Sequence, residues 1–482
     1  MKKENINKTR WSTCTQCQGT GKKIQKLRKK VRLQYKEELA LFEKSNGEGI
    51  VPERPKGHES SCSNCSGSGL IKTEDYPQAD TENYPQVAII GGGIGGVALA
   101  VACLHRGIPF TLYERDTHFD ARSQGYGLTL QQASKAIEGL GIFSLEDGVV
   151  STRHVVHTTN GEVVGEWGMR KWIQSSKKKA PRRTNIHIAR QSLRLALLEQ
   201  LEESKSVKWN HQLLDFKETN SGGVELNFLV NRKMYSTQAD LVVGADGIRS
   251  TVRSLLIGEE NDPLRYLGCI VILGICPLHN LEAVDSSLLD AATVFQTANG
   301  TERIYMMPYT LDSIMWQLSF PMGEEEAKSL SALGPKALKE EACRRTQWHS
   351  PIPQILAATK EEQISGYPVY DRKLLDLALL KNAGPVTLLG DAAHPMSPFK
   401  GQGANQALLD ALALARGISK GCRPSSNWKT DGIRHNVLTK FETEMIERSS
   451  SKVKDSAEAA KFLHSERVLH KVDAPRGRRQ KN

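Results

Sequence analysis

The pattern of hydrophobic and polar positions changes character at about residue 85. Before it the chain is mostly polar, with a helix-like stretch at 22–43 and a proline-containing segment at 71–84 that predicts a linker. After it an apolar strand at 87–90 leads through glycines into an apolar helix at 97–106, and a second strand follows at 110–113. This alternation predicts an α/β domain.

Further along, the pattern predicts antiparallel β-structure. Asn160-Gly161 and Asn299-Gly300 each separate two β-like runs, which is a strong hairpin signal. Around the second hairpin, the runs 271–275, 293–297, 303–309 and 313–320 predict an antiparallel sheet. An apolar strand is expected within 376–389, a helix at 404–416, and a polar helical tail at 421–482.

Composition places the chain among ordinary globular proteins. Its 482 residues, 39% hydrophobic and 25% charged, indicate two or three domains. The net charge of +11 is carried entirely by residues 1–36, and the remaining residues are neutral overall. A contact with an acidic protein or a nucleic acid is therefore expected only of the N-terminal segment, where a solvated basic helix is the simpler explanation.

The sequence favours a cytoplasmic protein with reduced thiols. The N-terminus is charged and lacks the apolar stretch of a signal peptide. The apolar run from Val87 to Leu104 is long enough to suggest a membrane span, but it contains five glycines, so we expect none.

Two copies of one short pattern, C-x-x-C-x-G-x-G, begin at Cys14 and Cys62. Two such pairs place four thiolates within reach of one tetrahedral zinc ion. The pattern resembles the zinc-binding units of DnaJ-type chaperones, which use four copies where this chain has two, so chaperone activity does not carry over. A redox dithiol is the alternative, although no thioredoxin-like pattern surrounds the pairs. The expected ligands are Cys14, Cys17, Cys62 and Cys65.

A glycine fingerprint follows the strand at 87–90. Gly91, Gly93 and Gly96 fit G-x-G-x-x-G between a strand and a helix, the context of a dinucleotide-binding turn. Glu114 ends the next strand, where an acid would hold the adenosine ribose. These features leave NAD and FAD both open.

Two later motifs separate them. Asp246-Gly247 lies within 239–253, and Gly390-Asp391 opens a segment that runs through Pro398 to Gln406. Together with the fingerprint and in this order, they resemble the motifs of class A FAD-dependent monooxygenases, including para-hydroxybenzoate hydroxylase-like and tetracycline-inactivating enzymes. The resemblance spans Val87 to Ser419.

The resemblance implies an enzyme that binds FAD, uses NADPH or NADH, and inserts one atom of O2 into a small, electron-rich, aromatic or polyketide-like substrate through a flavin C4a-hydroperoxide. The flavin performs the chemistry, so no catalytic side chain is expected, and His394 is expected to pack or orient its loop. The expected cofactor-binding residues are Gly91, Gly93, Gly95, Gly96, Glu114, Arg115, Arg190, Asp246, Asp391, Pro398, Gly401, Gln402, Gly403 and Ala404. Arg190 could equally be a surface arginine.

The implied fold is a Rossmann-like FAD domain with a parallel sheet, interrupted by an antiparallel-sheet substrate domain. The expected segments are a zinc module and linker at 1–84, FAD-domain segments at 85–150, 185–260 and 365–420, substrate-domain segments at 151–184 and 261–364, and a helical tail at 421–482.

Other functions remain open at this point. A flavin-dependent halogenase is disfavoured because no two of the seven tryptophans lie two positions apart, as its W-x-W pattern requires. A flavin reductase or dehydrogenase acting on isoprenoids is excluded only weakly. A flavin-bearing regulator working through the zinc module is a further alternative.

Overall fold

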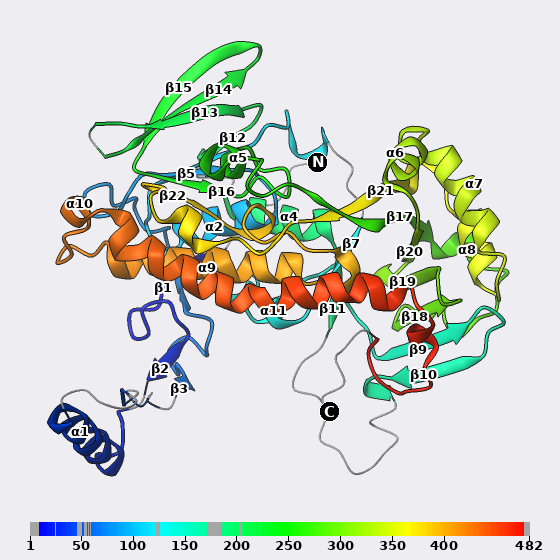
Figure 1. The fold of residues 1–482 in the computed structure, drawn as a ribbon, viewed down its shortest axis with the longest axis horizontal. Coiled ribbons are helices and arrows are strands. Elements are labelled where there is room, and N and C mark those ends of the chain that lie inside the picture. The colour runs from blue at the N-terminus through cyan, green and yellow to red at the C-terminus, as the bar shows by residue number, and fades with distance from the viewer. Residues whose placement is uncertain are drawn as a thin grey trace. The chain divides into compact units, whose positions relative to one another are not determined.

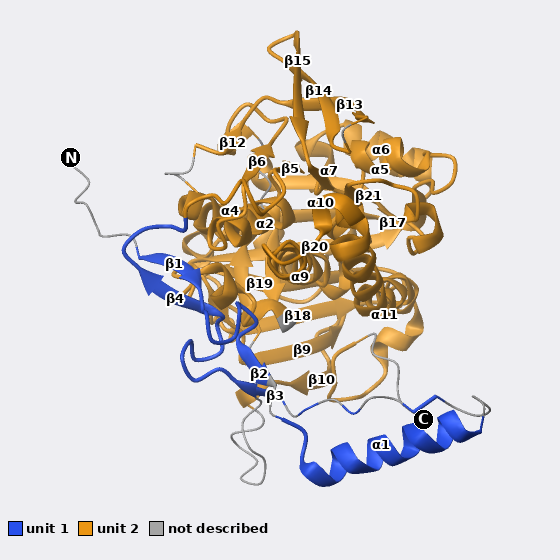
Figure 2. Ribbon diagram, turned by 90° about the vertical axis from the view of Figure 1, so that its left-hand side faces the viewer, with its two compact units in different colours: residues 1–77 blue, residues 78–482 orange. Residues whose placement is uncertain are grey.

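The computed structural model describes residues 9–24, 26–45, 51–52, 55, 57, 59–121, 126–170, 185–201, 205–220 and 222–476 (Figure 1). The chain divides into two compact units, Met1–Pro77 and Gln78–Asn482, coloured separately in Figure 2. Among the described helices, none is both long enough and apolar enough to pass through a bilayer.

The N-terminal unit contains two short strand pairs and one helix. β1 (Arg10–Thr13) pairs antiparallel with β4 (Leu70–Thr73), and β2 (Lys22–Ile24) pairs antiparallel with β3 (Glu59–Ser61). Helix α1 (Lys29–Lys44) begins later than the helix expected at 22–43, because residues 22–24 are extended and hydrogen-bond to β3.

The segment expected to be a linker, 71–84, is divided between the units. Its first residues belong to β4. Its last residues are fixed in the second unit, where the Asp80 N–H donates to the Gly107 carbonyl at 2.8 Å and Trp428 Nε1 donates to the Asn83 carbonyl at 2.7 Å.

A five-stranded parallel sheet forms the centre of the second unit. Its spatial order is β12 (Val207–Lys208), β6 (Phe110–Tyr113), β5 (Val87–Ile90), β16 (Leu241–Gly244) and β22 (Val386–Leu388). Helices α2 (Ile94–Leu104), α4 (Arg190–Leu198) and α9 (Gly403–Gly421) pack in the same core. All four residues of β5 and of β16 are buried, as the continuous apolar runs predict for a covered parallel sheet.

Two smaller antiparallel sheets flank this core. One contains β13 (Gln212–Glu218), β14 (Val224–Val230) and β15 (Lys233–Ala239), and the other contains β7 (Gly127–Leu130), β11 (Ile186–Ala189) and β8 (Val149–Val150). Helix α5 (Thr251–Ile257) follows β16.

A seven-stranded sheet forms the second layer of the unit. Its order is β10 (Val163–Trp167), β9 (Arg153–Thr158), β18 (Thr293–Ala298), β19 (Arg303–Thr310), β20 (Ser313–Pro321), β17 (Arg265–Pro277) and β21 (Ile364–Asp371). All pairs are antiparallel except β9 with β18. Both Asn-Gly sites are hairpin turns, and the fold class with its parallel and antiparallel sheets is confirmed.

One face of this sheet is covered by helices α6 (Glu324–Ala332), α7 (Pro335–Arg345) and α8 (Ile352–Ala358). Alternate residues such as Ile272, Ile304 and Trp316 enter this buried layer. Their neighbours Leu273, Tyr305 and Gln317 point to the other face, because successive side chains in a strand alternate sides.

The strand expected within 376–389 needs correction. It is limited to β22, because residues 377–380 form a 3₁₀ turn. The C-terminal segment contains the helices α10 (Trp428–Asp431) and α11 (Thr439–Leu463). Phe441 and Met445 of α11 are buried in the core, and α11 lies beside α9 (Figure 1). Part of the expected substrate segment, 171–184, and the end of the tail, 477–482, lie outside the described residues.

Trp316 gives a test of the helix-covered layer. It is fully buried, it lies against Gly274 on the paired strand, and its Nε1 donates to Thr359 Oγ1 at 2.9 Å. We expect Trp316→Ala to lower the free energy of unfolding by about 3–5 kcal/mol, measured by urea denaturation with circular dichroism. The control Leu311→Ala, at a side chain 73% exposed, should change it by less than about 0.5 kcal/mol. If both variants lost the same free energy of unfolding, the assignment of Trp316 to the buried layer would be wrong.

Candidate active site

The glycine turn after β5 brings helix α2 into close contact with the sheet. A Cβ atom at Gly96 would lie 1.9 Å from the Gly91 carbonyl oxygen, so only glycine fits there. Gly91 has φ +108°, and a Cβ atom there would lie 2.6 Å from the Ala245 carbonyl oxygen. At Gly93, by contrast, a Cβ atom would meet nothing within 4 Å, because this position faces open space.

Two cavities adjoin this turn at the carboxyl edge of the parallel sheet. The smaller cavity, of about 170 Å³, is lined by the expected residues Gly91, Gly93, Glu114, Arg115, Arg190 and Asp246. The larger cavity, of about 890 Å³, is lined by the expected residues Gly93, Gly95, Arg190, Asp391, Pro398, Gly401, Gln402, Gly403 and Ala404. Gly96 lines neither cavity, and its place is in the contact between α2 and the turn. The structure thus collects the expected residues from four distant parts of the sequence.

Glu114 is fixed at the smaller cavity by backbone donors. Its Oε2 accepts from the Gly92 N–H at 2.6 Å and its Oε1 from the Asp116 N–H at 2.9 Å. A residue that the sequence analysis missed, Arg194, donates from Nε to the Gly92 carbonyl at 2.7 Å and lies over the Trp209 ring. Its only sequence signal is its position four residues after Arg190 on α4, which places both on one helix face.

Arg190 begins helix α4 and faces both cavities, which does not fit a plain surface arginine. Its guanidinium lies 5.1 Å from the centre of the Tyr126 ring. This arrangement places a cation where the two cavities meet.

The Asp391 carboxylate faces the larger cavity. Surrounding protein raises the pKa of this carboxyl, an effect that the charges of His394 and Arg190 oppose. The side chain is nevertheless exposed to the open space of the cavity. Within the described part of the chain, its carboxylate accepts no hydrogen bond. An acceptor of this kind, held among protein atoms without a donor, fits a hydroxyl-bearing ligand.

His394 is fully buried and does not line the cavity. Its Nε2 lies 2.7 Å from Asp410 Oδ2, which also accepts from the Gly390 N–H at 2.9 Å, and Arg448 Nη2 donates to Asp410 Oδ1 at 2.8 Å. Burial alone would raise the pKa of Asp410, but the charges of His394 and Arg448 and their hydrogen bonds lower it. The geometry places His394 in a buried network that holds the loop after β22.

Asp246 lies beside the start of α5, whose N-cap residue is Ser250. Its carboxylate accepts from the Ser250 hydroxyl and from the Val252 N–H, the latter at 3.2 Å, and burial raises the pKa of this carboxyl. Arg253 in the same helix was not expected to matter. Its Nη1 donates to the Ala392 and Ala393 carbonyls at 2.7 and 2.8 Å, which ties the Asp246 motif to the Asp391 motif.

The start of α9 is held by Asn405, another residue that the sequence analysis did not single out. Its Oδ1 accepts from the Gln131 and Ala133 N–H groups, and its Nδ2 donates to the Thr129 and Gly401 carbonyls, all at 2.9–3.1 Å. The N-terminus of this helix, with Gly403 and Ala404, is thereby fixed at the cavity wall, where its dipole favours negative charge.

The opposite wall of the larger cavity is the uncovered face of the seven-stranded sheet. The apolar and aromatic residues of this sheet that line the cavity are Leu273, Val294, Met307, Met315 and Tyr367, and Tyr126, which precedes β7, lines it as well. A mostly apolar wall with a few polar groups is typical of a small-molecule pocket.

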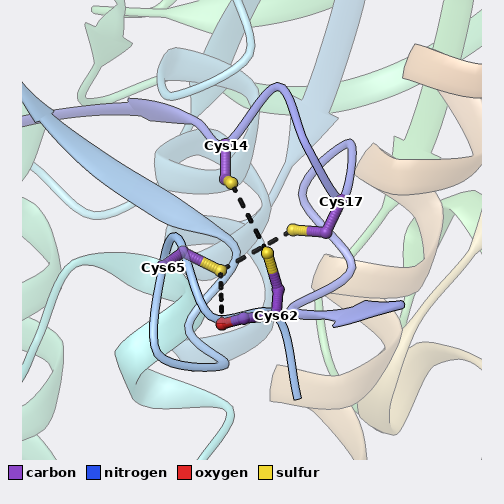
Figure 3. A group of neighbouring side chains, drawn as sticks. All are labelled: Cys14, Cys17, Cys62 and Cys65. Carbon is purple, nitrogen blue, oxygen red and sulfur yellow. Dashed lines mark hydrogen bonds between the residues drawn. The ribbon is translucent and has the colours of Figure 1, made fainter. Parts of the chain in front are cut away.

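The four paired cysteines of the N-terminal unit form a buried cluster (Figure 3). The sulfur of Cys14 lies 4.0 Å from that of Cys62, and the sulfur of Cys17 lies 3.7 Å from that of Cys65. These distances are close to the edge of a zinc–thiolate tetrahedron, about 3.8 Å for bonds of about 2.3 Å. None of these four cysteines forms a disulfide bond.

The two cysteine repeats are joined by equivalent backbone hydrogen bonds in both directions. The Cys14 N–H donates to the Gly69 carbonyl and the Cys62 N–H to the Gly21 carbonyl, each at 2.9 Å. The Gly21 and Gly69 N–H groups donate to the sulfurs of Cys17 and Cys65 at 3.3 and 3.2 Å. The glycines of the repeat thus wrap the backbone around the sulfur cluster.

Comparison with known proteins gives a consistent result. A family model described as FAD binding domain matches residues 84–427. The chain is 30% identical over 349 residues to an aurachin C monooxygenase/isomerase of Stigmatella aurantiaca, covering 69% of this chain and 80% of the relative. It is 28% identical over 352 residues to a 3-amino-4-hydroxybenzoate 2-monooxygenase of Streptomyces platensis, covering 70% of this chain and 80% of the relative.

Solved structures share the fold. HpxO of Klebsiella pneumoniae, complexed with FAD and uric acid, superposes with a TM-score of 0.63 at 20% identity, covering 79% of this chain and 89% of that one. A tetracycline destructase, Tet(51), gives a TM-score of 0.56 at 18% identity, covering 80% and 92%.

The contrast between Gly93 and Gly96 provides a test of the turn. We expect Gly96→Ala to lower the thermal midpoint of the flavin-free protein, because its methyl group collides with the Gly91 carbonyl and overpacking costs about 1–3 kcal/mol. Gly93→Ala should leave that midpoint unchanged and reduce flavin occupancy, because its methyl group enters the open cavity. Flavin absorbance per protein and calorimetry measure the two effects, and identical behaviour of the variants would contradict this assignment.

Proposed function

Because this chain belongs to the FAD binding domain family and is an FAD-dependent monooxygenase, we propose that it uses NADPH or NADH and O2 to place one oxygen atom on a small, electron-rich substrate. The observation that carries this proposal is the Asp391 carboxylate, which faces a large cavity without a hydrogen-bond donor in the described part of the chain. Ribityl hydroxyls would supply the donors that it lacks.

The residues along the two cavities fit FAD. Glu114 would accept from the adenosine ribose, because each of its oxygens keeps a free lone pair beside its backbone donor. The open space at Gly93 and the N-terminus of α2 would receive the pyrophosphate. The fixed N-terminus of α9, beside Gly403, would face the ring that gains negative charge on reduction.

Bound FAD would supply the redox chemistry: electrons taken from the nicotinamide and activation of O2. The protein contributes position and environment. The apolar sheet wall, with Leu273, Val294 and Met315, would hold a substrate and exclude water from the reacting oxygen. His394 holds the loop through Asp410 and touches no reacting atom.

We propose an aromatic or polyketide-like substrate. The cavity of about 890 Å³ would hold the flavin ring together with the substrate, and Tyr126 and Tyr367 among its lining residues offer aromatic surfaces. One relative is a monooxygenase of an aminohydroxybenzoate, which is a substrate of this class. The cytoplasmic setting and an acidic partner of the basic N-terminal segment stay predictions.

We further propose that Cys14, Cys17, Cys62 and Cys65 hold one structural zinc ion. Their four sulfurs lie within 4.8 Å of one another and are buried, which suits a closed tetrahedral site. In the described part of this unit, the apolar cluster consists of the four cysteines with Ile71 packed against them. Because so small a cluster buries little apolar surface, the bound metal would provide most of its stability.

Oxygen insertion is the direct test of the monooxygenase proposal. The purified, FAD-loaded protein should oxidise NADPH or NADH faster in the presence of a phenol or polyketide that it accepts, with one nicotinamide consumed per product. With isotope-labelled O2 the product should carry one labelled oxygen atom by mass spectrometry. Label taken from water, or product formed without oxygen as by a dehydrogenase, would contradict the proposal.

Zinc removal should affect only the N-terminal unit. Chelation or Cys62→Ser should abolish the one zinc per chain seen by elemental analysis and open residues 14–70 to protease, while flavin content stays unchanged. Cys343→Ser, at a half-buried cysteine of α7, is the control and should keep its zinc. Loss of FAD on chelation would show that the two units fold as one.

A further inference from the structure

The chain segment that follows α11 forms part of the wall of the large cavity. After α11 the chain makes a 3₁₀ turn, Glu466–Leu469, and then runs without regular structure to Arg476. Figure 1 shows this segment in red beside β10. Pro475 and Arg476 line the large cavity together with Leu463 of α11. Residues 470–476 are called the C-terminal strap below.

The strap starts from a well-packed anchor. Val468 is fully buried in a small apolar cluster with Ala298 of β18 and Leu463 of α11. Phe399, in the loop after β22, packs against the same cluster, and its ring lies edge-on to the His464 ring at 5.4 Å. The chain just before the strap is therefore fixed both to the seven-stranded sheet and to the loop after β22.

The strap itself buries few apolar groups. Lys471, Val472 and Asp473 are exposed, and its contacts with the edge strand β10 are polar. The Val472 N–H donates to the Val164 carbonyl at 3.1 Å, and the Glu166 N–H donates to Asp473 Oδ1 at 2.9 Å. A segment that is held by exposed hydrogen bonds and few buried apolar contacts opens locally at a low cost in free energy.

Arg476 is the buried exception in the strap. It is 9% exposed, and all three nitrogens of its guanidinium donate to backbone carbonyls. Nε donates to Val468, Nη1 donates to Val472 and Ala474, and Nη2 donates to Val164 and His470. The guanidinium thus folds the strap around itself and ties it to β10 through Val164. Hydrogen bonds from a charged donor are stronger than neutral ones, so this one side chain holds much of the strap.

The close approach of the strap to β10 depends on Gly165. A Cβ atom there would lie 2.3 Å from the Val472 carbonyl oxygen and 2.9 Å from Arg476 Nη2, and the three nearest atoms all belong to the strap. A methyl group at this position would therefore push against the strap from the side of the sheet. It offers a second way to release the strap, independent of the Arg476 side chain.

We propose that the C-terminal strap is a releasable closure of the large cavity, with Arg476 as its latch. When the strap is closed, Pro475 and Arg476 complete the cavity wall and limit the entry of water, which an oxygen-transferring site must exclude. Local opening of the strap admits the substrate and releases the product. Arg476 acts through the strap and is a positioning residue. This inference rests on the proposed function, since it concerns access to the same cavity.

Amide hydrogen exchange measures the opening of the strap without catalysis. In the FAD-loaded enzyme, without NADPH, NADH or substrate, Arg476→Gln and Gly165→Ala should each raise the exchange rate of the Val472 amide about tenfold, because lost charge-assisted hydrogen bonds or a steric clash shift the opening equilibrium. Quenching of flavin fluorescence by acrylamide, a small neutral molecule, measures access to the cavity. The quenching constant should rise in the same two variants.

Two matched controls should behave as the wild type in both measurements. Lys471→Gln removes a cation from the same strap, at an exposed ion pair with Glu162. Gly323→Ala adds a methyl group where a Cβ atom meets nothing within 4 Å. Flavin content and thermal midpoint verify that each variant is folded, and Gly165→Ala decides the matter if Arg476→Gln does not fold.

Three results would overturn the proposal. Unchanged exchange in the two strap variants would show that Arg476 is not a latch. Faster exchange with an unchanged quenching constant would show that the strap does not close the cavity. Equal effects in the controls would show that the response is not specific to the strap. A failed proposed function would instead appear as absent oxygen insertion while exchange and quenching respond as expected.

Discussion

At Gly96, helix α2 crosses the glycine turn so closely that a single added carbon would lie 1.9 Å from the Gly91 carbonyl oxygen. This contact sets the distance between the parallel sheet and its first helix. The same turn leaves Gly93 facing open space and brings the Gly92 N–H onto Glu114. The close approach of α2 to the turn is possible because Gly96 has no side chain, and the smaller cavity lies beside this turn.

The rest of the flavin site is held together by buried charged groups. Asp410 joins the loop after β22 to α11 through His394 and Arg448, and Arg253 joins that loop to the helix after β16. In each network an arginine is paired with a buried carboxylate, Arg448 with Asp410 and Arg253 with Asp262, which offsets the cost of burying the charges. The loop that carries Asp391 is held rigidly, and its own carboxylate is left for a ligand.

The seven-stranded sheet divides its two functions between its faces. One face packs Trp316 and its neighbours under three helices, and the other presents an apolar wall interrupted by a row of polar side chains that includes Gln296, Arg303 and Gln317. Strand alternation alone produces this division. The polar side chains of this row distinguish the cavity from a purely apolar one.

Much of this organisation could be derived from the sequence, because local pattern and backbone chemistry determine it. The run at 87–90, the glycines after it and the Asn-Gly hairpins have the predicted structures, since each depends on residues adjacent in the chain. The paired cysteine repeats likewise indicated their own cluster. The helix start at Lys29 and the short strand at 386–388 differ from expectation, because pairing with a distant strand and a 3₁₀ turn override local propensity. Only the tertiary structure decided the roles of Arg194, Arg253 and Asn405. An arginine near a carbonyl and an arginine facing a cavity look alike in a sequence, and what separates them is which partners the fold brings within hydrogen-bond distance.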